Sequence, residues 1–205
     1  LQSPSNPVVT ANSPSNFKVK INNYGSQPLT SAIVKYKIDN VPTTTTAGTW
    51  TGTIPGNAVV GQYNSAAYQF PSSINFTPGY RKIKVWTDSI IGRIDWEPEN
   101  DTAYFELVAC NGPLNGIYAI GNVSGVAADR TFANFKEAFK MLQGCGVSGP
   151  VTFKVFNLLP NQFYTDSLSF PTNITGASVA NYIKFTSAIS IQMVFLKPLK
   201  IANYN

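Results

Sequence analysis

Apolar and polar residues alternate along six short runs in the first half of the chain. Each run places apolar residues at every second position, as in Phe17-Lys18-Val19-Lys20-Ile21, and Asn, Gly, Pro or Asp residues follow it. This period of two is typical of half-buried β-strands, and no helical period occurs in the region. The runs are 17–22, 33–38, 50–54, 63–70, 80–87 and 102–108. They predict an antiparallel β-sandwich of about seven strands over residues 16–109, after a Pro- and Ser-rich linker or edge strand over residues 1–15.

The period changes in the second half of the chain. Phe132, Phe135, Phe139 and Leu142 recur at helical spacing within the segment 131–142, which predicts one amphipathic helix. Asp129 or Thr131 is expected to cap its N-terminus, and Gly144 is expected to end it.

Short apolar runs before and after this helix predict further strands. They are 118–121, 151–155, 168–170 and 182–185, and after the helix they recur about every 15 residues with Asn, Gly and Pro between them. Such strands suit parallel stacked coils, whose open apolar end needs a cover. We therefore expect residues 110–205 to form the helix-capped N-terminal part of a right-handed parallel β-helix, a mainly β fold like that of the preceding sandwich.

Composition narrows the function classes. The chain has 43% hydrophobic and 12% charged residues and contains no histidine, so the commonest general base and the commonest zinc ligand are both missing. Its formal net charge is +5. The lysines fall in alternating pairs that predict the solvent face of strands, and we expect no nucleic-acid partner. No apolar run reaches the roughly 20 residues of a membrane span.

Acidic residues concentrate in one stretch. Five of the ten carboxylates lie between positions 88 and 101, namely Asp88, Asp95, Glu97, Glu99 and Asp101. Converging carboxylates suit a calcium ion, which takes about six to eight oxygen ligands. The alternative is an acidic hairpin loop that keeps a sheet edge soluble. Apart from calcium, no cofactor is expected.

The two cysteines, Cys110 and Cys145, flank the segment that contains the helix. In an exported protein two cysteines usually pair, so we predict a disulfide. The alternative is two separate thiols, with Cys145 buried.

Three Asp-Ser/Thr-aliphatic triplets resemble the O-glycan acceptor pattern of some bacterial surface glycoproteins. The acceptors implied by that resemblance are Ser89, Thr102 and Ser167. Each Asp also suits a turn.

Two further resemblances concern larger segments. The order Asn22-Asn23-Tyr24-Gly25, 34–39, Trp50-Thr51-Gly52 and Asn100-Asp101-Thr102 resembles adhesion-type immunoglobulin-like (CARDB-like) domains of bacterial surface proteins. The phrases GVSGPVTF and NITGASVANYIKF resemble the N-terminal coils of pectin-lyase-like β-helix domains in large secreted bacterial proteins. The first resemblance implies a spacer or binding module. The second implies a scaffold, although some β-helix relatives are polysaccharide lyases or hydrolases.

The acids of the second half do not suit catalysis. Only Asp129, Glu137 and Asp166 occur there, with no pair at a plausible acid and base spacing. We therefore expect a non-catalytic, adhesin-like spacer or scaffold from a longer exported cell-surface protein, with glycans or other surface proteins and further domains of the same chain as partners. The Trp side chains could stack on sugars, but in a sandwich Trp is more often core; they are Trp50, Trp86 and Trp96. The alternatives are a carbohydrate-active enzyme with catalytic coils beyond residue 205 and a self-assembling filament subunit.

Overall fold

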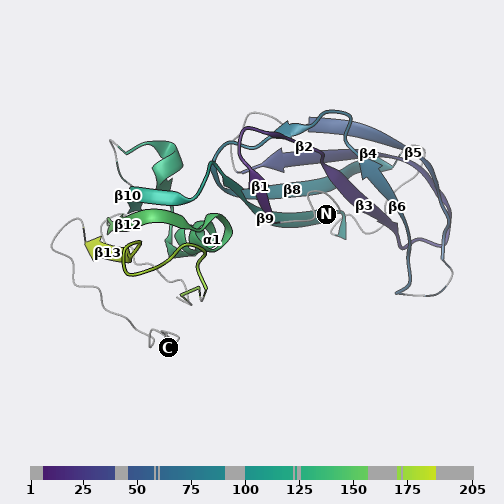
Figure 1. Cartoon of the computed structure of the whole chain (residues 1–205). Helices are drawn as coiled ribbons and strands as arrows, with labels where there is room; N and C mark the ends of the chain where they lie inside the picture. The colour runs from purple at the N-terminus through teal and green to yellow at the C-terminus, as the bar shows by residue number, and fades with distance from the viewer. Residues whose placement is uncertain are drawn as a thin grey trace. The chain divides into compact units, whose positions relative to one another are not determined.

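The computed structural model describes residues 7–39, 46–57, 59, 61–90, 100–121, 123, 126–156, 170–171 and 173–187. These residues form mainly β structure (Figure 1). The chain divides into two compact units. Unit 1 comprises Leu1–Val9, Ser13–Phe76 and Arg81–Leu107, and unit 2 comprises Thr10–Asn12, Thr77–Tyr80 and Val108–Asn205.

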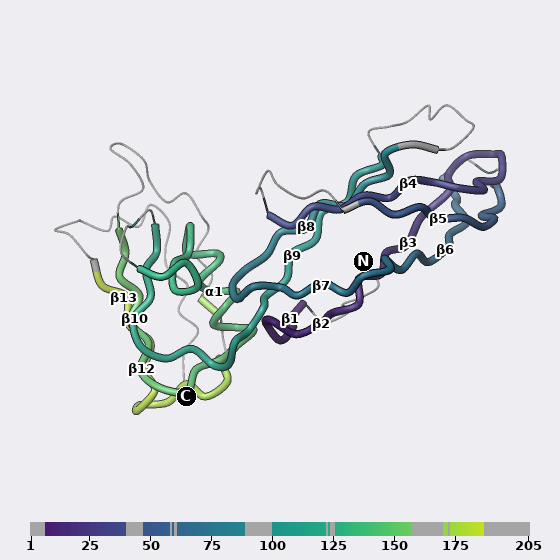
Figure 2. The backbone as a smooth tube through the Cα atoms, turned by 90° about the horizontal axis from the view of Figure 1, so that it is seen from above, coloured from purple at the N-terminus to yellow at the C-terminus, as the bar shows by residue number. Residues whose placement is uncertain are grey.

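Unit 1 is built from one five-stranded sheet and two short strand pairs. The sheet has the order β1 (Val8–Thr10), β9 (Thr102–Cys110), β8 (Gly79–Ile90), β4 (Leu29–Ile38) and β5 (Thr46–Ile54). The pairs are β3 (Lys18–Asn23) with β6 (Asn64–Gln69) and β2 (Pro14–Ser15) with β7 (Ile74–Asn75), both antiparallel. Strand β4 also pairs antiparallel with β5 and β8. Figure 2 shows β3, β6 and β7 in a different layer from β4 and β8, which confirms the predicted sandwich.

Aromatic rings join the two layers of unit 1. Phe17 is fully buried, and its ring lies 4.8 Å from that of Tyr36 on β4 and 5.3 Å from that of Phe70. The Phe70 N–H donates to the Phe17 carbonyl at 2.9 Å. Because Phe17 and Phe70 directly precede β3 and follow β6, this cluster fastens the β3–β6 pair over the larger sheet.

The lysine pairs lie on the outer faces, as their spacing predicted. Val19, Tyr36 and Ile83 are each buried between two exposed or half-buried lysines. The Lys35 ammonium forms an ion pair with Asp88 at 2.7 Å. These charges therefore belong to the solvated surface of the sandwich.

Unit 2 contains a four-stranded sheet of the order β11 (Thr131–Phe132), β10 (Leu114–Ile120), β12 (Val147–Val155) and β13 (Ile183–Ser187). All three pairings are parallel. Tyr118 pairs with Phe153, and Phe153 pairs with Phe185. Partners in these two pairs are 35 and 32 residues apart. The interval of about 15 residues between the runs after the helix stays a prediction, because it depends on the run 168–170. Phe170 lies outside any strand, while residues 168 and 169 are outside the described residues.

The helix α1 spans Phe135–Cys145, and its ends differ from those predicted. The side chain of Asn134 caps it by accepting from the Glu137 N–H at 3.0 Å, whereas Asp129 lies in a separate 3-10 turn, η2 (Ala128–Arg130). At the other end Gly146, with φ of 68°, follows the last helical residue and its N–H donates to Leu142. Glycine adopts a positive φ after a helix at a lower steric cost than other residues, because it has no Cβ.

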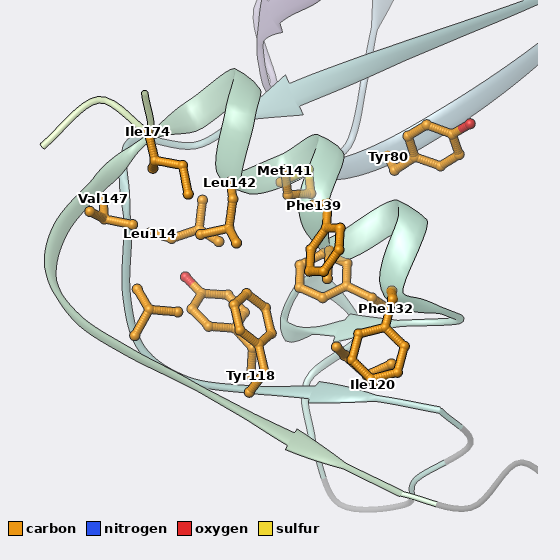
Figure 3. Packing of buried hydrophobic residues seen from close by; sticks show 14 of the residues in the cluster. Tyr80, Leu114, Tyr118, Ile120, Phe132, Phe139, Met141, Leu142, Val147 and Ile174 are labelled. Carbon is orange, nitrogen blue, oxygen red and sulfur yellow. The ribbon is translucent and has the colours of Figure 1, made fainter. Parts of the chain in front are cut away.

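The apolar side of α1 packs on the parallel sheet. Figure 3 shows Phe139 and Leu142 directed toward side chains of the strands. The rings of Phe135 and Phe139 lie 5.9 and 5.8 Å from that of Phe185 on β13. The helix therefore covers one face of the sheet. Within the described residues unit 2 has this single sheet, so a parallel β-helix is not shown.

Glycine at position 48 is required by the sandwich core. A Cβ there would overlap the hydroxyl of Tyr68 on β6 and lie 2.9 Å from its Cζ. Burial also raises the pKa of the Tyr68 hydroxyl, since an uncharged phenol is favoured where water is excluded.

Gly48→Ala is expected to destabilise unit 1 by about 1–3 kcal/mol, the usual cost of overpacking a core. Urea unfolding followed by fluorescence measures the loss. Adding Tyr68→Phe should recover part of it, because the overlapping hydroxyl is removed, while Thr49→Ala on the same strand serves as the control. If Gly48→Ala destabilised the chain equally with and without Tyr68→Phe, the contact would be contradicted.

Candidate functional site

The disulfide between Cys110 and Cys145 is present, as predicted. The two Cα atoms lie 5.5 Å apart, across a sequence separation of 35 residues. Cys110 ends β9 and Cys145 ends α1, so the bond holds the end of the helix beside the start of β10. The Leu114 N–H donates to the Gly146 carbonyl at 2.9 Å next to it. The disulfide therefore fixes the end of the helix that covers the parallel sheet.

The acidic stretch is described only at its two ends. Asp88 on β8 pairs with Lys35, and the Asp101 carbonyl accepts from the Thr87 N–H at 3.3 Å. Asp95, Glu97 and Glu99 lie outside the described residues. Across the described ranges no three His, Cys, Asp or Glu side chains gather as a metal site would need. Both interpretations of this stretch, the calcium site and the acidic loop, stay predictions.

Two of the three predicted O-glycan acceptors lie within the described residues. Thr102 begins β9 and is half-buried, and Ser89 lies in β8 opposite Ile33 of β4. Ser167 is outside the described residues. Glycosylation at these positions stays a prediction.

The tryptophans do not form a sugar-binding surface among the described residues. Trp50 is 6% exposed and belongs to the sandwich core. Trp86 is half-buried, with the Lys84 ammonium 5.0 Å from the centre of its ring. Trp96 is outside the described residues. The expectation that Trp is more often core is therefore confirmed for Trp50.

Two carboxylates of unit 2, those of Glu137 and Asp129, lie within the described residues. Glu137 is half-buried, and its Oε2 accepts from the Ala133 N–H at 3.0 Å at the start of α1. Asp129 is exposed within η2. Asp166 lies outside the described residues. Glu137 therefore contributes to the N-terminal cap of α1.

Sequence reasoning missed the exposed tyrosines of unit 1. Tyr24 and Tyr63 are 50% and 44% exposed, and their ring centres lie 4.9 Å apart. A signal for them exists, because each adjoins an Asn at a strand end, in Asn23-Tyr24-Gly25 and Gln62-Tyr63-Asn64. Only the pairing of β3 with β6 brings the two together.

Comparisons with known proteins return CARDB domains among solved structures. The solution NMR structure of the CARDB domain of PF1109 from Pyrococcus furiosus is 21% identical with a TM-score of 0.37, and the match covers 51% of this chain and 86% of that one. The crystal structure of the same domain in complex with di-metal ions is 17% identical with a TM-score of 0.37, covering 51% of this chain and 81% of that one. No family model and no curated protein matches the chain.

No helix within the described part of the chain is both long and apolar enough to cross a bilayer.

Replacing both cysteines by serine is expected to lower the free energy of unfolding of unit 2 by roughly 3–4 kcal/mol, because an open loop of this length has more entropy when unfolded. Urea unfolding with and without reductant measures the change. Reductant should destabilise the wild type by a similar amount and leave the double variant unaffected. Unchanged unfolding of the wild type in reductant would contradict a stabilising bond.

Calcium distinguishes the two interpretations of the acidic stretch. If residues 88–101 form a solvated acidic loop, adding calcium to chelator-treated protein should leave its melting temperature unchanged, since an ion must bind the folded state to stabilise it. Glu97→Gln combined with Glu99→Gln is the control. A calcium-dependent rise in the wild type that this variant loses would establish the metal site instead.

Proposed function

We propose that this chain is a non-catalytic module of an exported bacterial cell-surface protein, acting as an adhesin-like spacer and scaffold with carbohydrate as its ligand class. In this proposal unit 1 is an adhesion-type immunoglobulin-like domain. Unit 2 is the helix-capped start of a right-handed parallel β-helix.

The observation that carries the proposal is the in-register ladder of rings on β10, β12 and β13. The Tyr118 and Phe153 ring centres lie 5.7 Å apart, and those of Phe153 and Phe185 lie 4.9 Å apart with planes inclined by 12°. Parallel strands that repeat one side chain position are the unit from which solenoids grow. A helix that covers such a face and is held by a disulfide suits a structural role.

Export is supported by the disulfide. Bonds of this kind persist in oxidising compartments and are rare in the cytosol. The absence of histidine from the sequence and the structural surroundings of Asp88 and Glu137 support a module that binds or spaces rather than catalyses.

Surface labelling of the source cells tests the proposal. An antibody against the folded chain should label intact cells, external protease should remove that signal, and Cys110 and Cys145 should resist alkylation until reductant is added. A cytosolic protein from the same cells is the control. Labelling only after permeabilisation, with alkylation of both thiols without reductant, would refute export.

Two assays test the competing classes. Incubation with polysaccharides should release no new chain ends, and light scattering should give a mass independent of concentration. Cleavage would favour a carbohydrate-active enzyme instead, and growth of the scattering mass would favour a filament subunit.

A further inference from the structure

The outer face of the β3–β6 pair ends in two exposed tyrosines. Alternate residues of both strands form it, and we call it the tyrosine face: Lys20, Asn22 and Tyr24 on one side, and Tyr63, Ser65 and Ala67 on the other. The strand register places Lys20 opposite Ala67, Asn22 opposite Ser65 and Asn23 opposite Asn64. Tyr24 and Tyr63 follow directly beyond the last pair.

We propose that the tyrosine face binds a carboxylate-bearing polysaccharide, with the rings of Tyr24 and Tyr63 stacked on its sugars. This inference rests on the proposed function and names the site and the ligand class within it.

The loops that carry both tyrosines are held together by a hydrogen-bond network. The Asn23 side-chain amide donates to the carbonyls of Gln27 at 2.8 Å and Ile54 at 3.1 Å. The Asn64 amide donates to Pro55 at 3.1 Å and Gly56 at 3.2 Å. Because each tyrosine adjoins one of these asparagines, its backbone is positioned before any ligand binds, which lowers the entropic cost of binding.

Close backbone contact fixes the distance between the two loops. The Asn57 N–H donates to the Gly25 carbonyl at 2.9 Å. A Cβ at Gly56 would collide with the backbone of Ser26 and Gln27. The spacing of the rings therefore follows from a rigid scaffold.

A cross-strand tyrosine pair can also serve stability alone, since such pairs contribute favourably to a sheet. That role does not require the rings to face water. Yet both remain about half exposed, whereas each other ring contact among the described residues includes a buried or half-buried ring. Exposed aromatic surface next to polar side chains is typical of ligand-binding sites.

The strand surface beside the rings carries small or polar side chains. Ser65 and Ala67 are small and exposed, and the neighbouring Asn22 is also exposed. An extended sugar chain can lie along these residues with its hydroxyls near the amide and its apolar ring faces against the tyrosines. Polar side chains next to two exposed rings are the chemistry that an open polysaccharide site requires.

The charge of this face selects the ligand class. The Lys20 ammonium lies 5.4 Å from the centre of the Tyr63 ring, and the segments 17–28 and 54–70 contain no Asp or Glu. A cation on strands and loops that carry no acidic residue of their own attracts an anion. Uronic acid residues supply both a carboxylate for Lys20 and a ring for the tyrosines.

Calorimetric titration of the whole chain with a short oligogalacturonate tests the proposal, with a neutral maltooligosaccharide of equal length as the comparison. Tyr24→Ala and Tyr63→Ala should each weaken oligogalacturonate binding by about tenfold, while Tyr63→Phe should retain it because the ring remains. Lys20→Gln should weaken oligogalacturonate binding by about two- to fivefold and abolish its advantage over the neutral oligomer.

Tyr104→Ala is the matched control, because Tyr104 is a 73% exposed tyrosine elsewhere in unit 1; its binding should be unchanged. Melting temperatures verify that each variant folds. If the wild type binds and both alanine variants bind equally well, the tyrosine face is wrong while carbohydrate binding stands. If the wild type binds neither oligomer, the site and the carbohydrate role both fail, but export and the spacer role do not.

Discussion

The parallel register of β10, β12 and β13 is the constraint on which unit 2 depends. It places Tyr118, Phe153 and Phe185 in one row, and a slip of one residue would turn a whole strand to the other face. Parallel strands cannot be joined by a tight turn, so the chain must travel far between them. The return from β10 to β12 contains α1, whose Phe135 and Phe139 reach the ring of Phe185. The connection between these parallel strands therefore also supplies the helix that covers the sheet.

The disulfide and the glycine after α1 also support the parallel register of the strands. Helix α1 ends at Cys145, and Gly146 reverses the chain with a positive φ so that β12 begins at Val147. Cys110 precedes β10 by a short turn. The disulfide therefore joins the points just before two neighbouring parallel strands, which keeps their starts level. A second close approach supports this corner, since a Cβ at Gly176 would collide with the carbonyl of Val147.

Local periodicity predicted the strands and the helix that are long enough to show a repeating pattern. Alternation in residues 17–22 and 33–38 led to β3 and β4, and the phenylalanine spacing identified the covering helix. It missed β7, which is two residues long, because so short a strand has no period to detect. The helix start was misplaced because Asn134 and Glu137 form the N-terminal cap, and the Asn-x-x-Glu spacing was overlooked. The separations of 35 and 32 residues between paired parallel strands were not predicted, because long connections carry no local signal.

The exposure of Tyr24 and Tyr63 depends on information that no single segment holds. Tyrosine is intermediate in burial preference, and Tyr36 and Tyr68 of the same unit lie in the core. Tyr24 stands two residues after Asn22 and four after Lys20, so it continues the outer face of β3. The inner face is already filled by Phe17 and Phe70 against the larger sheet, and a core at crystal-like density has no room for further rings. Packing on the inner side of the strand pair therefore leaves the rings of Tyr24 and Tyr63 on the outer side.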